Sequence, residues 1–220
     1  MTLALPEQVA PASLRERIVE RLRNSVPGHE PEFPYAANLT PEQVAELRQF
    51  LPERLARAAV LVPLVERPDG LNVLLTLRAS HLKNHAGQIS FPGGRIEEGD
   101  ADAWEAALRE AREEIGLEDR YVSLAGYLRD HVVISGFRVT PVVAFVQPDF
   151  VLRLDTTEVE DAFEVPLQFV LDPANHVPRE RHFAGRTIVT HDIRYQDRQI
   201  WGATATMLLT LSRVLEGGRA

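Results

Sequence analysis

The residues of this chain best suited to chemistry lie in one short run that begins at Arg109. Three glutamates follow it, Glu110, Glu113 and Glu114. On a helix, residues three and four apart lie on one face, so the three carboxylates would share a patch. Their mutual repulsion would be offset by a hard divalent cation that takes oxygen ligands. The pattern therefore predicts a site that holds a divalent metal against phosphate.

An acidic surface that is merely solvated is the alternative for such a run. A turn at Gly93 and Gly94 lies a short distance upstream. Glycine allows backbone to approach an ion without a Cβ in the way, so this turn favours the metal site.

A helix over residues 103–115 has to position the glutamates. Its apolar stripe consists of Trp104, Leu108, Ala111 and Ile115, which recur at helical intervals opposite the carboxylates. Asp102 is the expected N-cap, with Glu105 as its capping-box partner, and Gly116 is the expected C-cap. Arg109 lies four residues from both Glu105 and Glu113, so it can bridge both.

This stretch resembles the Nudix box, G-x5-E-x7-R-E-U-x-E-E-x-G-U, where U is a bulky aliphatic residue. The matching residues are Gly94, Arg109, Glu110, Glu113, Glu114, Gly116 and Leu117, with Ala111 smaller than usual at the first U. The interval from Gly94 to Arg109 is one residue longer than in the pattern. The first acidic position therefore falls on Asp100 when counted from Gly94, and on Ala101 when counted from Arg109.

The preceding segment, residues 74–94, resembles the signature LLTxR[SA]x3Rx3Gx3FPGG of coenzyme A diphosphatases, a Nudix subfamily. The residues that fit are Leu74, Leu75, Thr76, Arg78, Ala79, Gly87, Phe91, Pro92, Gly93 and Gly94. Lys83 replaces the second arginine of the signature, which keeps the charge but loses the two-pronged guanidinium.

The resemblance implies a Mg²⁺- or Mn²⁺-dependent hydrolase that splits coenzyme A or its thioesters into 4'-phosphopantetheine and adenosine 3',5'-bisphosphate. It also implies metal ligands at the three glutamates and the Gly93 carbonyl. Arg109 is expected to orient a carboxylate, and the cations expected to meet substrate phosphates are Arg78, Lys83 and Arg95.

The general base stays open between Glu113 of the box and two residues of a later acidic loop, Glu158 and Glu160. Either loop glutamate has a purely structural alternative. His81 and His85 have the spacing of a metal pair, but the glutamate of a zincin motif is missing between them, so we expect hydrogen-bonding or packing roles.

Two other functions remain as alternatives. One is hydrolysis of another nucleoside diphosphate derivative, such as ADP-ribose, NADH, a dinucleotide or an oxidised nucleotide. The other is a non-catalytic domain that senses a nucleotide, although such domains usually lose the box carboxylates that this chain keeps.

The composition limits the kinds of site and partner that the chain can have. The chain has 220 residues, a net charge of −8 and no cysteine, so disulfides, thiolate metal sites and cysteine nucleophiles are excluded. The acidic balance argues against nucleic-acid binding, and neither a signal peptide nor an apolar run of membrane-spanning length is visible. We expect a cytoplasmic enzyme acting on a small molecule, with a homodimer left open.

The pattern of elements predicts an α/β/α sandwich around a mixed sheet, which is also the fold that the resemblance implies. Residues 1–55 are expected to form an N-terminal extension with helices at 13–25 and 41–50, packed on a hydrolase domain at 56–220. The strands expected there cover 58–65, 71–77, 121–134 and 137–146, the last two joined by a hairpin at Ser135 and Gly136. A strand end at 164–167 passes into a short helix, a hairpin lies within 181–196, and a closing helix starts at Ile200.

Overall fold

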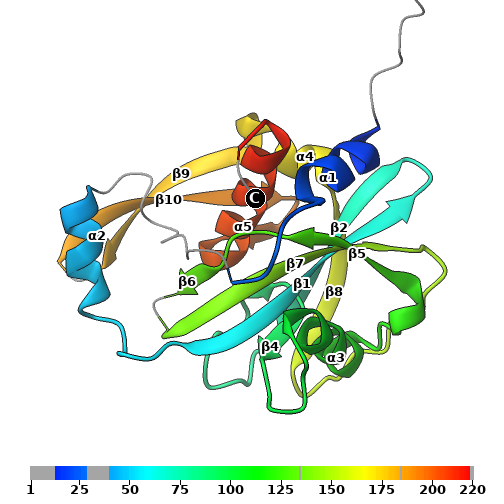
Figure 1. Ribbon diagram of the computed structural model, residues 1–220, viewed down its shortest axis with the longest axis horizontal. Coiled ribbons are helices and arrows are strands. Elements are labelled where there is room, and N and C mark those ends of the chain that lie inside the picture. Colours follow the sequence, from blue (N-terminus) through cyan, green and yellow to red (C-terminus); the bar gives the residue numbers. More distant parts are fainter. Residues whose placement is uncertain (1–12, 29–39, 134, 184, 219–220) are drawn as a thin grey trace, which may run out of the picture.

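The computed structural model describes residues 13–28, 40–133, 135–183 and 185–218 (Figure 1). Within them, one sheet contains β1 (Ala56–Arg67), β2 (Gly70–Arg78), β3 (Ile89–Ser90), β4 (Gly93–Arg95), β5 (Val122–Tyr127), β6 (His131–Val133), β7 (Phe137–Val146) and β8 (Val159–Pro166). Its main path is β3-β2-β1-β7-β5, while β4 pairs with β1, β6 with β7 and β8 with β2. The central pair, β1 and β7, is parallel, and the other pairs are antiparallel. The predicted mixed sheet is confirmed.

Helices cover both faces of this sheet (Figure 1). The helix α3 (Ala103–Ile115) packs on one face, and α1 (Leu14–Leu22), α4 (Leu167–Leu171) and α5 (Gly202–Leu215) pack on the other. In β1, Leu61 and Val65 face α3, whereas Val62 and Leu64 face the opposite cluster. A strand buried on both faces reads as a continuous apolar run, which is why this segment shows no polar alternation. The predicted α/β/α sandwich is confirmed.

The two N-terminal helices form where local capping signals predict them. Ser13 and Glu16 make a capping box at the start of α1, and Thr40 and Gln43 exchange equivalent bonds before α2 (Pro41–Arg48). Ile18 and Leu22 of α1 belong to the same buried cluster as the sheet. The expected extension also includes residues 1–12 and 29–39, which lie outside the described part of the chain, and the boundary at residue 55 stays a prediction.

The strand expected over 121–134 is in fact two strands, β5 and β6, preceded by the short helix η2 (Asp119–Tyr121). The pairing of β5 with β7 shifts register between Leu124 and Gly126, and this irregularity bends the strand. Gly126 also packs directly on α1, where a Cβ would lie 2.7 Å from the Leu22 side chain. The hairpin predicted at Ser135 and Gly136 is confirmed by the antiparallel pairing of β6 with β7.

The C-terminal region contains a second sheet with the order β11-β10-β9. It consists of β9 (His176–Phe183), β10 (Arg186–Tyr195) and β11 (Arg198–Ile200), and follows α4 and the short helix η3 (Pro173–Asn175). The predicted hairpin within 181–196 is confirmed but begins earlier. The closing helix begins at Gly202 because Ile200 still belongs to β11, where it pairs with Ile193 of β10. Among the described helices, none has the length and apolar character needed to span a bilayer.

Candidate active site

The helix that carries the box glutamates has the predicted bounds, Ala103–Ile115. Asp102 caps its start by accepting bonds from the backbone N–H groups of Trp104 and Glu105, and Gly116 ends it in a left-handed conformation, φ 69°. The expected capping box is wrong in one detail. The Glu105 carboxylate accepts from the Ala101 N–H, not from Asp102.

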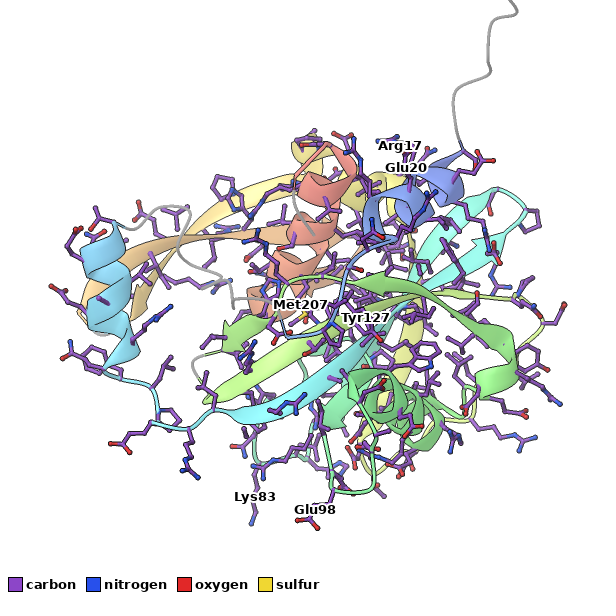
Figure 2. The ribbon with its side chains drawn as sticks, viewed as in Figure 1. Arg17, Glu20, Lys83, Glu98, Tyr127 and Met207 are labelled. Carbon is purple, nitrogen blue, oxygen red and sulfur yellow. The ribbon has the colours of Figure 1, made fainter. Side chains whose placement is uncertain are left out.

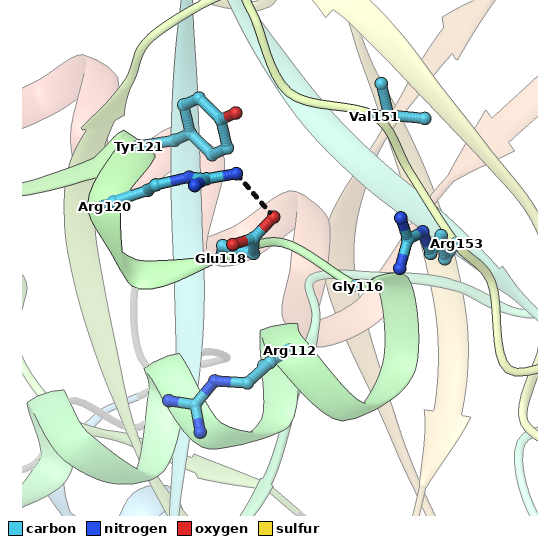
Figure 3. A pocket seen from close by; sticks show the side chains of 7 residues that line it. All are labelled: Arg112, Gly116, Glu118, Arg120, Tyr121, Val151 and Arg153. Atoms are coloured by element: carbon cyan, nitrogen blue, oxygen red, sulfur yellow. Dashed lines mark hydrogen bonds and ion pairs between the residues drawn. The ribbon is translucent and has the colours of Figure 1, made fainter.

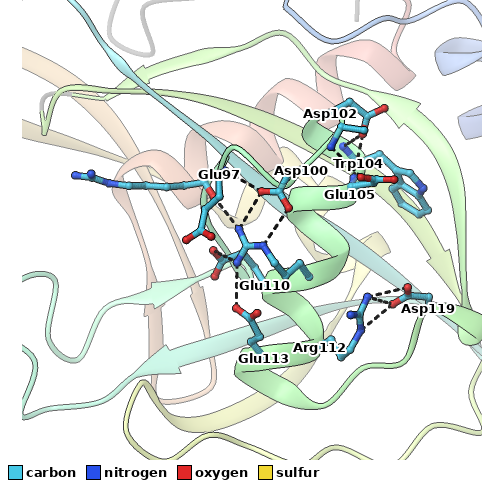
Figure 4. Close-up of polar contacts among 12 residues, drawn as sticks. Glu97, Asp100, Asp102, Trp104, Glu105, Glu110, Arg112, Glu113 and Asp119 are labelled. Atoms are coloured by element: carbon cyan, nitrogen blue, oxygen red, sulfur yellow. Dashed lines mark hydrogen bonds and ion pairs between the residues drawn. The ribbon is translucent and has the colours of Figure 1, made fainter.

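Arg109 is the centre of the polar network on this helix, and Figure 4 labels its carboxylate partners Asp100, Glu110 and Glu113. Its Nε and Nη2 donate to the two oxygens of Asp100 at 3.0 and 3.1 Å. Its Nη1 donates to Glu110 at 2.9 Å and Glu113 at 3.0 Å, and Nη2 also reaches the Arg95 carbonyl at 2.9 Å. A guanidinium has five N–H groups, and here all five are used.

Of the two bridges expected for Arg109, the structure shows the one to Glu113. Its N–H groups donate to four partners, and Glu105 is not among them, so the expected bridge to Glu105 is wrong. Asp100, whose side chain is 6% exposed, takes the two-pronged contact, and the bonds from Arg109 hold the pKa of Asp100 below its ordinary value. Asp100 therefore fills the acidic position that sequence counting left open between it and Ala101.

Glu114 is buried, with only 3% of its surface exposed, although the helical spacing places it opposite the apolar stripe. Burial raises its pKa to about 8, while the charge of Arg78 and the Gly93 N–H act in the opposite direction. The Arg78 guanidinium lies 3.6 Å from one carboxylate oxygen, and the Gly93 N–H donates to the other at 3.2 Å.

The Gly-Gly turn explains how carboxylates fit between helix and sheet. A Cβ at Gly94 would overlap the Glu110 carboxylate, and a Cβ at Gly93 would overlap the backbone of Ala59 and Val60 in β1. The turn thus brings β4 close enough to α3 to enclose two glutamates. The role of the Gly93 carbonyl as a metal ligand stays a prediction.

Charged side chains from more than one segment act on the pKa values of Glu110 and Glu114. Burial raises the pKa of Glu110, Arg109 opposes this, and the charges of Glu113 and Glu158 add to it. Glu158 likewise acts on Glu114. Glu113 is held by Arg109 with its side chain 59% exposed, so Glu158 is the acidic neighbour that Glu110 and Glu114 share.

The donor set suits a hard divalent cation. No preformed cluster of three acidic or imidazole side chains in metal-binding geometry exists among the residues that the structure describes. However, burial disfavours the charged forms of Glu110 and Glu114, and a dication between oxygen donors would restore them. The two carboxylates therefore fit Mg²⁺ or Mn²⁺ in their chemistry.

Of the three cations expected to meet phosphate, only Arg78 lies against these carboxylates. Arg95 is exposed and its guanidinium stacks 5.1 Å from the centre of the Phe137 ring. Lys83 is also exposed, and Figure 2 shows it at the outer edge of the molecule, pointing away from the fold.

The later acidic loop contacts residues 74–94, here called the signature segment. Glu160 accepts a bond from the Ser80 N–H at 3.1 Å, and His81 Nε2 lies 3.1 Å from the Thr157 carbonyl. His85 Nδ1 lies 2.8 Å from the Gln88 side chain. The hydrogen-bonding roles predicted for both histidines are confirmed. The sequence carries no signal for the link between His81 and Thr157, because nothing in it shows that the two loops meet.

A cavity of about 440 Å³ lies at the C-terminal end of α3, the end that also carries Glu113 and Glu114 (Figure 3). Its lining includes Arg112, Arg120 and Arg153 and none of the predicted site residues. Arg112 pairs with Asp119, and Arg120 with Glu118. The carbonyl end of a helix also disfavours anions. The cavity is therefore separate from the carboxylate cluster.

Comparisons with known proteins find a family model, curated relatives and solved structures that are similar to this chain. A family model described as the NUDIX domain matches residues 55–185. The uncharacterized Nudix hydrolase NudL of Salmonella paratyphi B is 39% identical over 156 residues, which are 71% of this chain and 81% of that protein. The same figures hold for NudL of Salmonella newport. Among solved structures, a MutT/nudix family protein from Enterococcus faecalis is 17% identical with a TM-score of 0.46, covering 83% of this chain and 72% of that one.

Proposed function

The chain belongs to the NUDIX family, and from this premise we propose that it cleaves the pyrophosphate bond of coenzyme A or a coenzyme A thioester. The family makes it a hydrolase of a nucleoside diphosphate derivative. The products of the proposed reaction are 4'-phosphopantetheine, with its acyl group where present, and adenosine 3',5'-bisphosphate.

The attachment of the signature segment to Glu114 carries the proposal. The segment begins at β2 and ends at the Gly-Gly turn, and it contacts Glu114 near both ends, through the Arg78 side chain and the Gly93 N–H. A substrate bound along this segment would therefore have its phosphates beside the carboxylates. Arg78 is the cation in place to meet a phosphate there, since a guanidinium suits phosphate oxygens.

Glu110 and Glu114 would hold the metal, with Glu113 and the Gly93 carbonyl as further proposed ligands. A bound Mg²⁺ or Mn²⁺ supplies charge neutralisation on the phosphates and makes water a better nucleophile. Arg109 does not touch substrate in this scheme. It fixes the Glu110 carboxylate and ties it to Asp100 and the turn backbone.

We assign the general base to Glu158. Its charge helps to raise the pKa of both Glu110 and Glu114, and its loop is bonded to the Glu114 carbonyl through the Asp155 N–H, whereas Glu160 is engaged with the Ser80 N–H. In the reaction, the Glu158 carboxylate would take a proton from the attacking water as the new P–O bond forms. The bridging P–O bond breaks, and its electrons leave with the departing phosphate.

Hydrolysis of coenzyme A in the presence of Mg²⁺, Mn²⁺ or a chelator tests the proposal, with ADP-ribose and NADH as parallel substrates and products resolved by chromatography. We expect adenosine 3',5'-bisphosphate to appear only with metal, and faster than either comparison substrate is cleaved. Equal rates on all three compounds, or cleavage of a comparison substrate alone, would overturn the coenzyme A assignment and leave the hydrolase class standing.

A further inference from the structure

The signature segment and the loop that carries Glu158 are joined by three consecutive residues. The Ala79 N–H donates to the Glu158 carbonyl at 2.8 Å. The Ser80 N–H donates to the Glu160 carboxylate, and the His81 ring meets the Thr157 carbonyl. Because a carbonyl only accepts, Nε2 of His81 must carry the proton in this contact.

These contacts fix both peptide groups that flank Glu158. The Thr157 carbonyl before it is held by His81, and the Glu158 carbonyl after it is held by Ala79. The Glu158 N–H donates to the Asp155 carbonyl at 3.0 Å. The two peptide planes set the direction in which the Glu158 side chain leaves the backbone. His81 supplies the one side-chain bond among these three.

The same loop is anchored to the metal-binding helix. The Asp155 N–H donates to the Glu114 carbonyl at 2.9 Å, and the Asp155 carboxylate accepts from the backbone and hydroxyl of Thr157. The loop is therefore bonded at two places, to the C-terminal end of α3 and to the signature segment. Without His81, the support on the signature side rests on the bonds to Ala79 and Ser80 and on the pairing of Arg78 with Val159.

We propose that His81 is a positioning residue for the reaction, which holds the Thr157 carbonyl so that the Glu158 carboxylate stays beside Glu110 and Glu114. This inference rests on the proposed role of Glu158 and does not depend on which nucleoside diphosphate derivative is cleaved. Small misplacements of a catalytic group have large effects on rate. The contact is exposed, and its loss should misplace the loop without unfolding the protein.

His81→Ala removes the donor, and His81→Gln supplies an amide N–H that can reach the same carbonyl. The matched control is His85→Asn, in the same loop. Among the described residues its side chain bonds to Gln88 of the same loop, and asparagine tolerates the left-handed backbone at this position, φ 58°. For whichever substrate the wild type cleaves fastest with Mg²⁺, we expect His81→Ala to lower kcat about tenfold with KM nearly unchanged. His81→Gln should recover most of the loss.

Two further measurements keep the inference apart from the proposed function. In a Glu158→Gln background, His81→Ala should have no additional effect on kcat, because the two residues act in series. Without any substrate, amide hydrogen exchange at Ala79 and Glu158 should be faster in His81→Ala than in the wild type and the His85→Asn control.

The possible outcomes distinguish a failure of the base assignment from a failure of the positioning role. If Glu158→Gln retains full activity, the assignment of the base fails. If Glu158→Gln is impaired but His81→Ala matches the wild type, or adds its full effect in the Glu158→Gln background, the positioning role alone is overturned. Unchanged amide exchange at Ala79 and Glu158 in His81→Ala would also overturn it, whatever the turnover.

Discussion

Arg109 and Arg112 lie on the same helix and both bind carboxylates, yet their surroundings differ. Arg109 is 22% exposed and pairs with Asp100, whose side chain is 6% exposed. Arg112 is 53% exposed, and its partner Asp119 is 49% exposed. Both arginines make two-pronged contacts, with Nη2–carboxylate distances between 2.8 and 3.1 Å.

Similar geometry does not mean that the two ion pairs contribute equally to the free energy of unfolding. An exposed pair exchanges one set of water contacts for another and contributes little, whereas removing one partner of a buried pair leaves a charge without compensation. The buried network also includes Glu110, which is proposed as a metal ligand, while the exposed pair borders a separate cavity. The helix thus has a side proposed for catalysis and a solvated side that carry the same kinds of residue.

The largest effect should come from Glu114→Gln, on the buried side. Glutamine keeps the size of the side chain and an acceptor for the Gly93 N–H, so the fold should persist. We expect kcat to fall on the order of a thousandfold, equivalent to about 4 kcal/mol of lost transition-state stabilisation. Steady-state kinetics with saturating Mg²⁺ and a thermal melt without metal are the measurements. Turnover near that of the wild type would refute the metal assignment.

His131 extends the comparison to a buried group without a partner. It is 0% exposed, and neither ring nitrogen has a hydrogen-bond partner among the described residues. Burial, with the nearby charge of Arg213, lowers its pKa from 6.5 to about 4.

Between these two values the unfolded chain binds a proton that the folded protein does not. The contribution of His131 to the free energy of unfolding should therefore be constant above about pH 6.5 and fall by up to about 3 kcal/mol as the pH drops to about 4. Urea titrations of the wild type and of His131→Phe across this range would measure it. The difference in the free energy of unfolding between these two proteins should change by that amount, whereas the difference between the wild type and the exposed control His85→Asn should not. Parallel profiles for wild type and His131→Phe would show that His131 does not titrate in this way.

Arg109→Lys tests the five-bond network itself. Lysine keeps the charge, but its three N–H groups radiate from one atom and cannot serve four partners. We expect a loss of about 2 kcal/mol in the free energy of unfolding, with a ten- to hundredfold fall in kcat as Glu110 loses its support. Equilibrium unfolding and kinetics on the same preparation would check both. A variant with unchanged stability would mean that the buried network has no more weight than the exposed one.

The sequence predicts the parts of this site that local chemistry decides. The bounds of α3 follow from Asp102, the apolar stripe and Gly116, because capping and periodicity act within a few residues. The burial of Glu114 could not be predicted in the same way. It depends on how closely β4 approaches α3, which is set by the pairing of the Gly-Gly turn with β1.

Contacts between loops that lie far apart in the chain could not be predicted from the sequence either. Choosing Asp100 over Ala101 required the folded loop, since counting alone supports both. The stacking of Arg95 on Phe137 and the bond between His81 and Thr157 join segments far apart in the chain. No periodic pattern encodes such contacts, whereas the family signature marks segment 74–94 as important without showing what each residue touches.

The smallest effect should come from Arg112→Ala, and it sharpens the comparison most directly. The pair with Asp119 is exposed on both sides, so its removal should change the free energy of unfolding by at most about 0.5 kcal/mol. The position is near the carbonyl end of the helix, where a cation is mildly favourable, and this contribution is screened by salt. Urea unfolding at low and high ionic strength should therefore show a small loss that shrinks with salt, and kcat should equal that of the wild type. A loss comparable to that of Arg109→Lys would show that burial does not decide the weight of these two arginines.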